Sequence, residues 1–485
     1  MKKFKSYMLI ILMVAAASAF AMRNGTTVAQ SSTIQLEMFI GAQTTDTLQK
    51  LVNDYNSQTP GVNVTVNEGS WETNSQFDTY STRFQAEDSS FDIISMDVIW
   101  PPAFIENGWL APLNDVFPAS EQAKFLQAPI KAGTVNGTIY GMPWFHDSGL
   151  LYYRTDVLQY AKDQGLIQEA RPPKDWTELR EMAANLSSSS VITNQFGEMD
   201  GFVWQAKAYE GLMCDFMEFL GGTGQTSWLT TYDNGTVAPN LDTQNVKDAL
   251  EFMHSLISSG ASPEAVTTFD EEGSRAIWDS GDAIFHRNWP YAYALSLQSQ
   301  ALNGSDAGTG EQVFDVAPMP PQTAGDENAL TSALGGWQLG LNAFSKHKAE
   351  AKDFMLWLTS EQQQLRYFAG NGNLPTRESA YNVTKMQEAG AGDQTYVVDF
   401  LPAFKKAIPR PSHPDYPAMS QELWDPMNSA VAGDTAPAAA ATQMQAAVNK
   451  VLTGSDVQRA PFNPLWAFFA LIAMGTAVRF RRRRK

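Results

Sequence analysis

The alternation of strand and helix patterns near the N-terminus constrains the fold of this chain more than any other feature. Residues 33–40 have a strand pattern, residues 45–58 a helix pattern that ends at Pro60-Gly61, and residues 62–66 a second strand pattern. Two strands that are joined through a helix pair in parallel, because the helix carries the chain back to the starting edge. The sequence therefore predicts an α/β fold with a doubly wound lobe.

A third strand pattern ends in a carboxylate. A helix pattern over residues 76–86 leads to an apolar strand pattern over residues 91–97, whose last residue is Asp97. Ligands of open α/β sheets bind at the carboxyl ends of the strands, which places Asp97 well for a polar contact with a ligand. The alternative is that Asp97 caps the next helix, residues 98–107, and one side chain can serve both roles.

The rest of the chain is a mixture of helix and strand patterns without an internal repeat. Strand patterns cover residues 141–145, 150–154, 282–285, 313–318 and 337–341, and helix patterns cover residues 176–187, 209–220, 243–259, 273–280, 348–359, 395–406, 417–431 and 436–452. The last helix begins near Pro437, and proline is favoured in a first helical turn.

The two ends of the chain indicate export. Lysines at positions 2, 3 and 5 precede an apolar run and then small residues, which is the layout of a secretory signal peptide over residues 1–21. After a spacer over residues 453–463, residues 464–485 combine an apolar stretch with a terminal basic cluster. Because basic residues stay on the cytoplasmic side, we expect this segment to be a membrane anchor or sorting tail. The predicted location is the extracellular face of the cell membrane.

The charge balance excludes polyanionic ligands. The formal net charge is −18, and nine of the 34 basic residues lie in the two terminal segments. The remaining body has 25 basic residues against 52 acidic residues. A surface with this charge repels nucleic acid and anionic lipid. We therefore expect no nucleic-acid partner.

The chain has a single cysteine, Cys214, so burial of apolar side chains and not a disulfide within the chain must hold the fold together. N-x-S/T sequons along the body of the chain predict surface loops and a glycoprotein; they begin at Asn63, Asn136, Asn185, Asn234, Asn303 and Asn382.

Support for catalysis is weak. The five histidines show no metal-ligand spacing, and the chain has neither a G-x-S-x-G elbow nor a P-loop. We expect no enzyme activity, no cofactor and no metal. The alternative is a secreted glycan-active hydrolase, whose carboxylate pair would be assembled by the fold alone.

Many aromatic residues lie beside turns and polar residues, and not only at the periodic positions of helices and strands that would face the core. Examples are Trp144-Phe145-His146-Asp147, Asn288-Trp289-Pro290-Tyr291 and Gly335-Gly336-Trp337. Sugars present apolar C–H faces and a rim of hydroxyls, so a sugar site needs aromatic platforms together with carboxylate, amide or guanidinium groups. The alternative is that these rings fill gaps in the core.

These segments resemble the extracellular solute-binding proteins of ABC sugar importers, and most closely the trehalose/maltose-binding proteins. The similar stretches run in family order from residue 33 to about residue 452; they include residues 96–100, 106–110, 147–154, 201–205, 209–212, 287–291, 334–337 and 409–411.

The resemblance implies a two-lobed periplasmic-binding-protein-like fold, with a ligand cleft between the lobes and three interlobe crossings. Lobe 1 would comprise residues 33–146 and 318–366, and lobe 2 would comprise residues 147–317 and 367–452. The family's sugar-contacting positions match Asp97, Asp147, Trp289, Tyr291, Gly336, Trp337 and Arg410.

The chain departs from the family pattern at two places. Where the family has an acidic residue after the first strand, this chain offers Gln43, Thr44 or Asp46 as the sugar partner. Where the family has an arginine in the second helix, this chain has Gln76-Phe77.

The function implied by the resemblance is capture of a sugar, such as trehalose, maltose or a short oligosaccharide. The implied partners are the membrane permease subunits of an ABC importer, with the ATPase reached indirectly, and the expected oligomeric state is a monomer. A surface adhesin or sensor that binds sugar without an importer is a further alternative.

Overall fold

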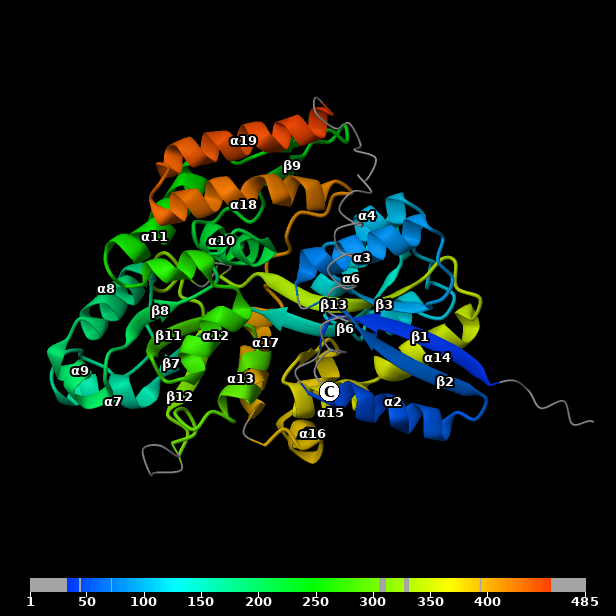
Figure 1. Ribbon diagram of the computed structural model, residues 1–485, viewed down its shortest axis with the longest axis horizontal. Helices are drawn as coiled ribbons and strands as arrows, with labels where there is room; N and C mark the ends of the chain where they lie inside the picture. Colours follow the sequence, from blue (N-terminus) through cyan, green and yellow to red (C-terminus); the bar gives the residue numbers. More distant parts are fainter. Residues whose placement is uncertain are drawn as a thin grey trace, which may run out of the picture.

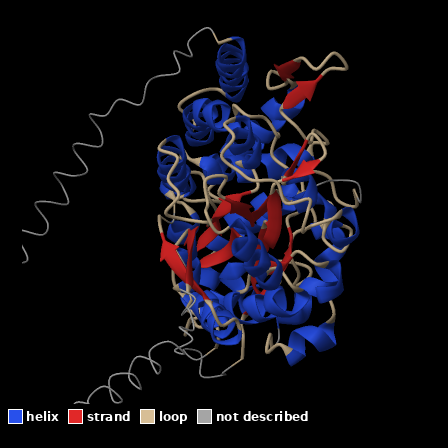
Figure 2. Cartoon of the chain, turned by 90° about the vertical axis from the view of Figure 1, so that its right-hand side faces the viewer, coloured by secondary structure: helices blue, strands red, loops and turns tan. Residues whose placement is uncertain are grey.

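The computed structural model describes residues 33–42, 45–70, 72–304, 311–326, 331–392 and 394–454. Two mixed sheets lie beside one another in this part of the chain, and helices pack around them (Figure 1). Seen from the side, the large sheets occupy the middle of the molecule and the helices lie outside them (Figure 2). This arrangement is the predicted two-lobed α/β architecture.

The larger sheet has six strands. Their order is β14 (Leu374–Pro375), β6 (Gly141–Ser148), β13 (Leu334–Leu341), β3 (Ile93–Asp97), β1 (Ile34–Ile40) and β2 (Val62–Glu68). Strand β1 pairs in parallel with both β2 and β3, through the connecting helices α2 (Thr47–Gln58) and α3 (Thr73–Gln85). The parallel pairing predicted from the N-terminal alternation is confirmed.

The smaller sheet has four strands in the order β12 (Phe314–Pro318), β7 (Leu150–Arg154), β11 (Ala283–Asn288) and β8 (Asp200–Val203). Two short hairpins complete the strands, β4 (Thr134–Val135) with β5 (Thr138–Ile139) and β9 (Leu229–Thr231) with β10 (Val237–Pro239).

The remaining α-helices are divided between the two sheets. The six-stranded sheet is accompanied by α4 (Pro101–Glu106), α5 (Ala119–Gln122), α6 (Gln127–Ala132), α14 (Lys348–Leu358), α15 (Glu361–Asn371) and α16 (Val383–Glu388). The four-stranded sheet is accompanied by α7 (Thr155–Asp163), α8 (Trp176–Ser187), α9 (Ser190–Phe196), α10 (Glu210–Gly222), α11 (Gln244–Ser258), α12 (Glu271–Asp279), α13 (Tyr291–Ser296), α17 (Val397–Phe404), α18 (Tyr416–Ala432) and α19 (Pro437–Thr453). Short 3₁₀ helices cover residues 264–268, 378–380 and 394–396.

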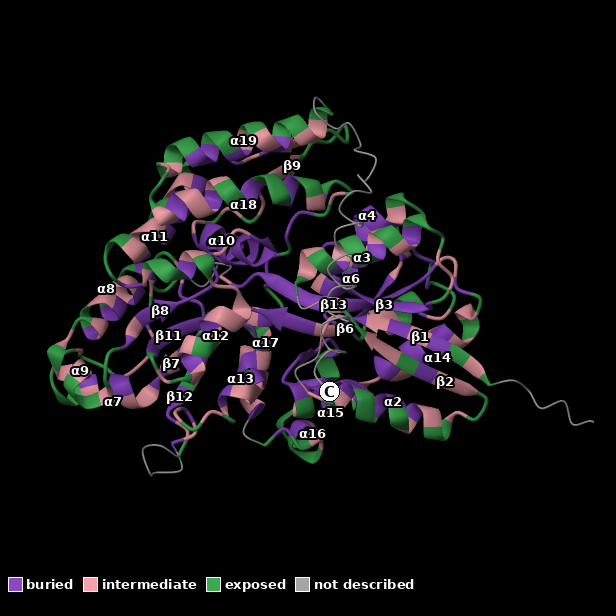
Figure 3. Ribbon diagram, viewed as in Figure 1, coloured by how far each residue is buried: buried purple, intermediate pink, exposed green. Residues whose placement is uncertain are grey.

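Helix α10 is buried on every side, as Figure 3 shows near the middle of the molecule. It packs against α11 and α18, which in turn contact α19. A helix that is covered all round must also bury its acidic residues, and Asp215 and Glu218 are each at most 2% exposed. Such groups require partners, because an unpaired buried charge is strongly unfavourable.

Three segments pass between the two sheets, and hydrogen bonds hold them side by side. Ser332 donates from its hydroxyl to the carbonyl oxygen of Gly149 at 2.5 Å, between β6 and β7. Leu334 N–H donates to the Ile408 carbonyl at 2.7 Å, and Ile408 N–H donates to the Ser332 carbonyl at 2.8 Å. Three connecting segments, at Gly149, Ser332 and Ile408, therefore meet in one place.

A buried ion pair lies directly beneath these crossings. The guanidinium of Arg287 donates to both carboxylate oxygens of Glu218, at 2.9 and 2.5 Å. The same carboxylate accepts from Ala333 N–H at 3.2 Å. A Cβ added at Gly149 would lie 1.9 Å from Glu218 Oε1, so only glycine fits at this point of the crossing.

Several predicted elements match the structure closely, and others were missed. Strand β7 and helix α8 have the predicted bounds, whereas α7, α15 and β8 were not predicted. Helix α15 is rich in glutamine and lies partly buried, which gives it a weak apolar pattern.

Some predictions are not tested by the described residues. The signal peptide over residues 1–21 and the apolar tail over residues 464–485 both lie outside them, as does most of the spacer. In the described part of the chain, no helix has the length and apolar character needed to cross a membrane. The lobe boundaries at residues 146, 317 and 366 stay predictions.

We expect Gly149→Ala to lower the free energy of unfolding by about 1–3 kcal/mol, because the new methyl group must displace the Glu218–Arg287 pair. Urea denaturation would measure the change. Gly69→Ala is the matched control, since a Cβ there meets only the Ile40 carbonyl at 3.4 Å. Equal unfolding midpoints for the two variants would contradict the close packing at the crossing.

Candidate functional site

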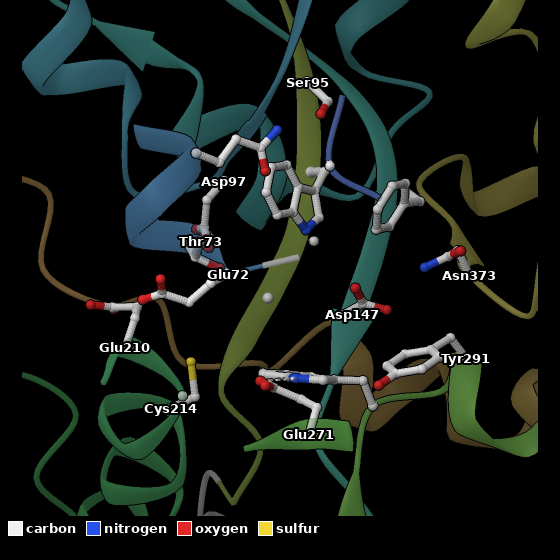
Figure 4. A pocket seen from close by; sticks show the side chains of 18 of the residues that line it. Glu72, Thr73, Ser95, Asp97, Asp147, Glu210, Cys214, Glu271, Tyr291 and Asn373 are labelled. Atoms are coloured by element: carbon white, nitrogen blue, oxygen red, sulfur yellow. Dashed lines mark hydrogen bonds between the residues drawn. The ribbon is translucent and has the colours of Figure 1, made fainter. Parts of the chain in front are cut away.

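A cavity of about 420 Å³ is lined by residues from both sheets and from the helices beside them (Figure 4). Asp97 enters it from the end of β3, Trp337 from β13, and Asp147 from β6 near the crossing. Trp289 and Tyr291 enter from the segment that follows β11. Segments far apart in the sequence thus meet where the carboxyl end of a parallel strand faces the second sheet.

The structure brings together seven of the ten residues that the sequence suggested for sugar binding. Asp97, Asp147, Trp289, Tyr291, Gly336, Trp337 and Arg410 all line the cavity. Asp46 is not part of the lining: it is exposed at the start of α2 and pairs with Lys50 at 2.8 Å. Gln43 and Thr44 lie outside the described residues. The binding role of each residue stays a prediction.

Arg410 joins two carboxylates, one at the end of β3 and one at the start of α10. Its Nη2 donates to Asp97 Oδ1 at 2.8 Å, and its Nη1 donates to Glu210 Oε1 at 2.7 Å. Glu210 also accepts from the Tyr416 hydroxyl at 2.6 Å and from the Ser420 hydroxyl at 2.5 Å. The Arg410 side chain is thereby held between β3 and α10.

Asp97 lies at the cavity, as its position at the strand end suggested, but it does not cap the helix that follows: the N-cap residue of α4 is Trp100, and no side chain caps that helix. Asp97 Oδ1 instead accepts from Ile99 N–H at 3.1 Å in the turn between β3 and α4, while the carboxylate also lines the cavity. Burial raises the pKa of the Asp97 carboxyl, Arg410 opposes this rise, and Glu210 adds to it. The ion pair with Arg410 therefore limits the free-energy penalty of burying Asp97.

The Asp147 carboxylate has fewer hydrogen-bond partners than the Asp97 carboxylate. The residue is 7% exposed, and its Oδ1 has no hydrogen-bond partner among the residues that the structure describes. Burial raises the pKa of the Asp147 carboxyl well above its usual range, Asp97 adds to this rise, and Arg287 opposes it. Figure 4 shows the Asp147 carboxylate pointing into the cavity. A ligand that donates a hydrogen bond would satisfy this oxygen.

Two tryptophans are held rigidly at the cavity wall. The guanidinium of Arg287 lies 4.1 Å from the centre of the Trp289 ring, and Trp289 Nε1 donates to Glu271 at 3.2 Å. Trp337 packs edge to face against Trp100, with 5.3 Å between ring centroids. Because their positions are fixed by neighbours, both rings can act as platforms at little ordering cost.

Gly336 has a specific conformational reason to be glycine. Its φ of +101° is strained for any residue with a side chain, and an added Cβ would lie 2.5 Å from the Phe145 carbonyl. The register of β13 against β6 shifts just beyond it, between Trp337 and Gln338. Gly336 therefore lets β13 approach β6 closely while Trp337 reaches the cavity.

Sequence reasoning missed several lining residues. Glu271 accepts from the Tyr209 hydroxyl at 2.7 Å as well as from Trp289, and Glu272 accepts from the Tyr291 hydroxyl at 2.8 Å. Residues 270–272 are three consecutive acids at a helix start, a pattern that first suggests capping, and Asp270 does cap α12. Cys214 and Glu210 were missed as lining residues because α10 reads as a core helix.

The position where an arginine was expected has a neutral side chain in the lining. Gln76 donates from Nε2 to the Tyr80 hydroxyl at 2.6 Å and is 2% exposed. Its Oε1 has no hydrogen-bond partner within the described residues.

Metal chemistry has no visible support in the described part of the chain, where no group of three His, Cys, Asp or Glu residues is arranged to hold a metal. His146 is fully buried beside the cavity wall on β6, and burial lowers its pKa to about 3. It is therefore neutral at physiological pH.

Comparison with known sequences identifies related proteins. Residues 41–365 match the family described as bacterial extracellular solute-binding protein. A probable ABC transporter-binding protein of Deinococcus radiodurans is 33% identical over 338 residues, covering 69% of this chain and 72% of that protein. A mannitol-binding protein of Pseudomonas aeruginosa is 26% identical, covering 62% of this chain and 64% of that protein.

Comparison with solved structures supports the same fold. The maltose-bound MalE3 of T. maritima superposes with a TM-score of 0.73 at 32% sequence identity, covering 86% of this chain and 99% of that one. The similarity extends over nearly the whole of the solved chain, so the two-lobed fold applies to the described body as a unit.

We expect Asp147→Asn to stabilise the unliganded protein at neutral pH by about 1–3 kcal/mol, because the neutral amide is easier to bury than an unpaired carboxylate. The pKa of Asp147 is raised in the folded state, so the folded state binds more protons than the unfolded state between the usual and the raised pKa. The wild-type protein therefore loses stability as pH rises through that window.

The gain from Asp147→Asn should consequently be larger at pH 8 than at pH 4, because pH 4 lies close to the usual pKa of 3.8 and most of the window in which only the unfolded state loses its proton lies above it. Urea unfolding of the two proteins at pH 4, 6 and 8 measures it. A pH-independent difference between them would show that Asp147 is not the group responsible.

Proposed function

This chain belongs to the bacterial extracellular solute-binding protein family, and we propose that it captures a saccharide in the cavity between its two sheets for delivery to the membrane permease of an ABC importer. The observation that carries the proposal is the convergence of Trp289 and Trp337 with Asp97 and Asp147 on one cavity. Aromatic faces suit the C–H surfaces of a sugar, and carboxylates accept hydrogen bonds from its hydroxyls.

The relatives support the saccharide class. They include a mannitol-binding protein and a maltose-bound protein, and both ligands are compounds rich in hydroxyl groups. The cavity of about 420 Å³ falls within the range of roughly 300–1,000 Å³ that is usual for small-molecule sites. We propose a disaccharide such as trehalose or maltose, or a short oligosaccharide, as the ligand.

Binding would use motion about the three crossings. The segments at Gly149, Ser332 and Ile408 are hydrogen-bonded to one another, so a rotation there would move one sheet relative to the other. Arg410 contacts Asp97 on the six-stranded side and Glu210 on α10, and it would hold the two sides together over the ligand.

The cellular setting of the proposal follows from the chain ends and the family. We propose that the protein is exported as a monomer, is anchored at the extracellular face by residues 464–485, and meets the permease there. The ATPase of the importer would act on the other side of the membrane and have no direct contact with this chain.

The proposal is tested by titrating the soluble region, residues 33–452, with trehalose, maltose, maltotriose and mannitol while recording tryptophan fluorescence and heat. Saturable binding of at least one sugar is expected. A flat response to every sugar would contradict it. Chromatography of the sugars after long incubation separates capture from the hydrolase alternative, because a binding protein returns them intact.

We expect Trp289→Ala and Trp337→Ala each to weaken saccharide binding by about 10- to 100-fold, since buried tryptophans at binding sites usually contribute about 2 kcal/mol or more. Calorimetry of each variant gives the change. Trp357→Phe is the control, because Trp357 packs against Tyr55 and Phe354, away from the cavity. Unchanged affinity in both alanine variants would remove the two rings from the site.

A further inference from the structure

The charges around the cavity are unbalanced in a way that the proposed function does not require. Arg410 is the one basic residue among the described residues that line the cavity. Buried or half-buried carboxylates surround the same space, namely Asp97, Asp147, Glu210, Asp270, Glu271 and Glu272. Figure 4 labels Asp97, Asp147, Glu210 and Glu271 around the cavity.

Arg410 is already paired with two carboxylates. Both of its terminal nitrogens donate to them, at 2.7 and 2.8 Å, the residue is 5% exposed, and its Nε has no hydrogen-bond partner among the described residues. A ligand carboxylate or phosphate at this Nε would add a third negative charge around a single positive charge that already faces Asp97 and Glu210.

The basic residues near the rim are engaged as well. Lys207 pairs with Asp270 at 3.0 Å, and Arg275 pairs with Glu272 and Asp279. Arg287 is fully buried behind the Trp289 ring and is bound to Glu218. The position where an arginine was expected carries Gln76, which is neutral. Each of these cations in the described chain therefore already has a carboxylate partner.

Asp147 differs from these paired cations, because one of its carboxylate oxygens is a hydrogen-bond acceptor without a donor in the described residues. Its Oδ1 is buried without a hydrogen-bond partner in the described residues, and the side chain is more than nine-tenths buried. The carboxylate is aimed into the cavity (Figure 4). Burial and the neighbouring Asp97 both raise its pKa, and positive charge at this point would offset both effects.

We propose that the cavity selects saccharides by charge, taking neutral saccharides and those that carry an ammonium group beside Asp147, and rejecting those that carry a carboxylate or phosphate. The proposal rests on the proposed saccharide function and narrows it. Like charges brought together in a site that excludes water repel strongly, whereas an ammonium group at Asp147 gains a charge-assisted hydrogen bond.

The test uses two matched series in calorimetry with the soluble region. One series is trehalose, 6-amino-6-deoxytrehalose and trehalose 6-phosphate; the other is maltose, 6′-amino-6′-deoxymaltose and maltose 6′-phosphate. In the series whose neutral parent binds, we expect the phosphate to bind at least ~100-fold more weakly than the parent, as like-charge contacts are worth several kcal/mol. The amino sugar should bind as tightly as the parent or up to ~10-fold more tightly.

Two substitutions connect the selectivity to Asp147. In Asp147→Asn, the affinity of the amino sugar relative to its parent should fall by about 10-fold, because the charge-assisted bond is lost. Asp233→Asn removes one negative charge from an exposed turn outside the cavity and should leave the ratio unchanged. A ratio that changes equally in both variants would indicate a general charge effect and overturn the assignment to Asp147.

The outcomes separate the two proposals. If a neutral parent binds and its phosphate binds within about 10-fold of it, charge selection is wrong while saccharide capture stands. If the parent sugar binds and its amino derivative does not, the proposed role of Asp147 is wrong, while saccharide capture again stands. If neither parent nor any sugar of the wider panel binds, the proposed function fails and charge selection fails with it.

Discussion

The buried pair between Arg287 and Glu218 is the interaction on which the rest of the architecture depends. Glu218 lies on a helix that is covered on every side, and its carboxylate also binds the backbone of Ala333 in one of the crossing segments. Arg287 supports the Trp289 ring from behind at 4.1 Å. One ion pair therefore joins the α10 core, the interlobe crossing and an aromatic wall of the cavity, and loss of either partner would leave the other as an uncompensated buried charge where these three parts meet.

The cavity combines groups that a stable core would avoid. Asp147 and Gln76 each keep a buried oxygen without a hydrogen-bond partner in the described residues, and Arg410 keeps its Nε in the same condition. Unsatisfied polar atoms of this kind lower stability when no ligand is present, and they become favourable contacts when a hydroxyl or ammonium group arrives. The arrangement is that of a site whose polar atoms are positioned before binding, which reduces the ordering cost of capture.

Much of the fold could be predicted from periodicity, and part of the site could be predicted from local chemistry. Asp97 was recognised because a buried strand ended in a carboxylate, and the structure shows it at the end of β3 on the cavity wall. Glu271 was not recognised, since its two donors, Tyr209 and Trp289, are separated from it along the chain and meet it only in the folded state. Asp46 was suggested as a sugar partner from its place in the sequence, but it does not reach the cavity. Its carboxylate faces solvent and pairs with Lys50 in the first turns of α2.

The sequence alone determined the α/β class, the parallel order of the first strands and the aromatic segments beside turns, because these follow from interactions between residues close together in the chain. The tertiary structure decided which carboxylates face the cavity, which of them are neutralised by Arg410, and that Asp147 is left without a donor. Those properties arise from contacts between residues far apart in the chain, such as Arg410 and Asp97, which are separated by 313 residues. Burial and the distance between such groups set the charge balance of the cavity, and neither can be read from a local sequence pattern.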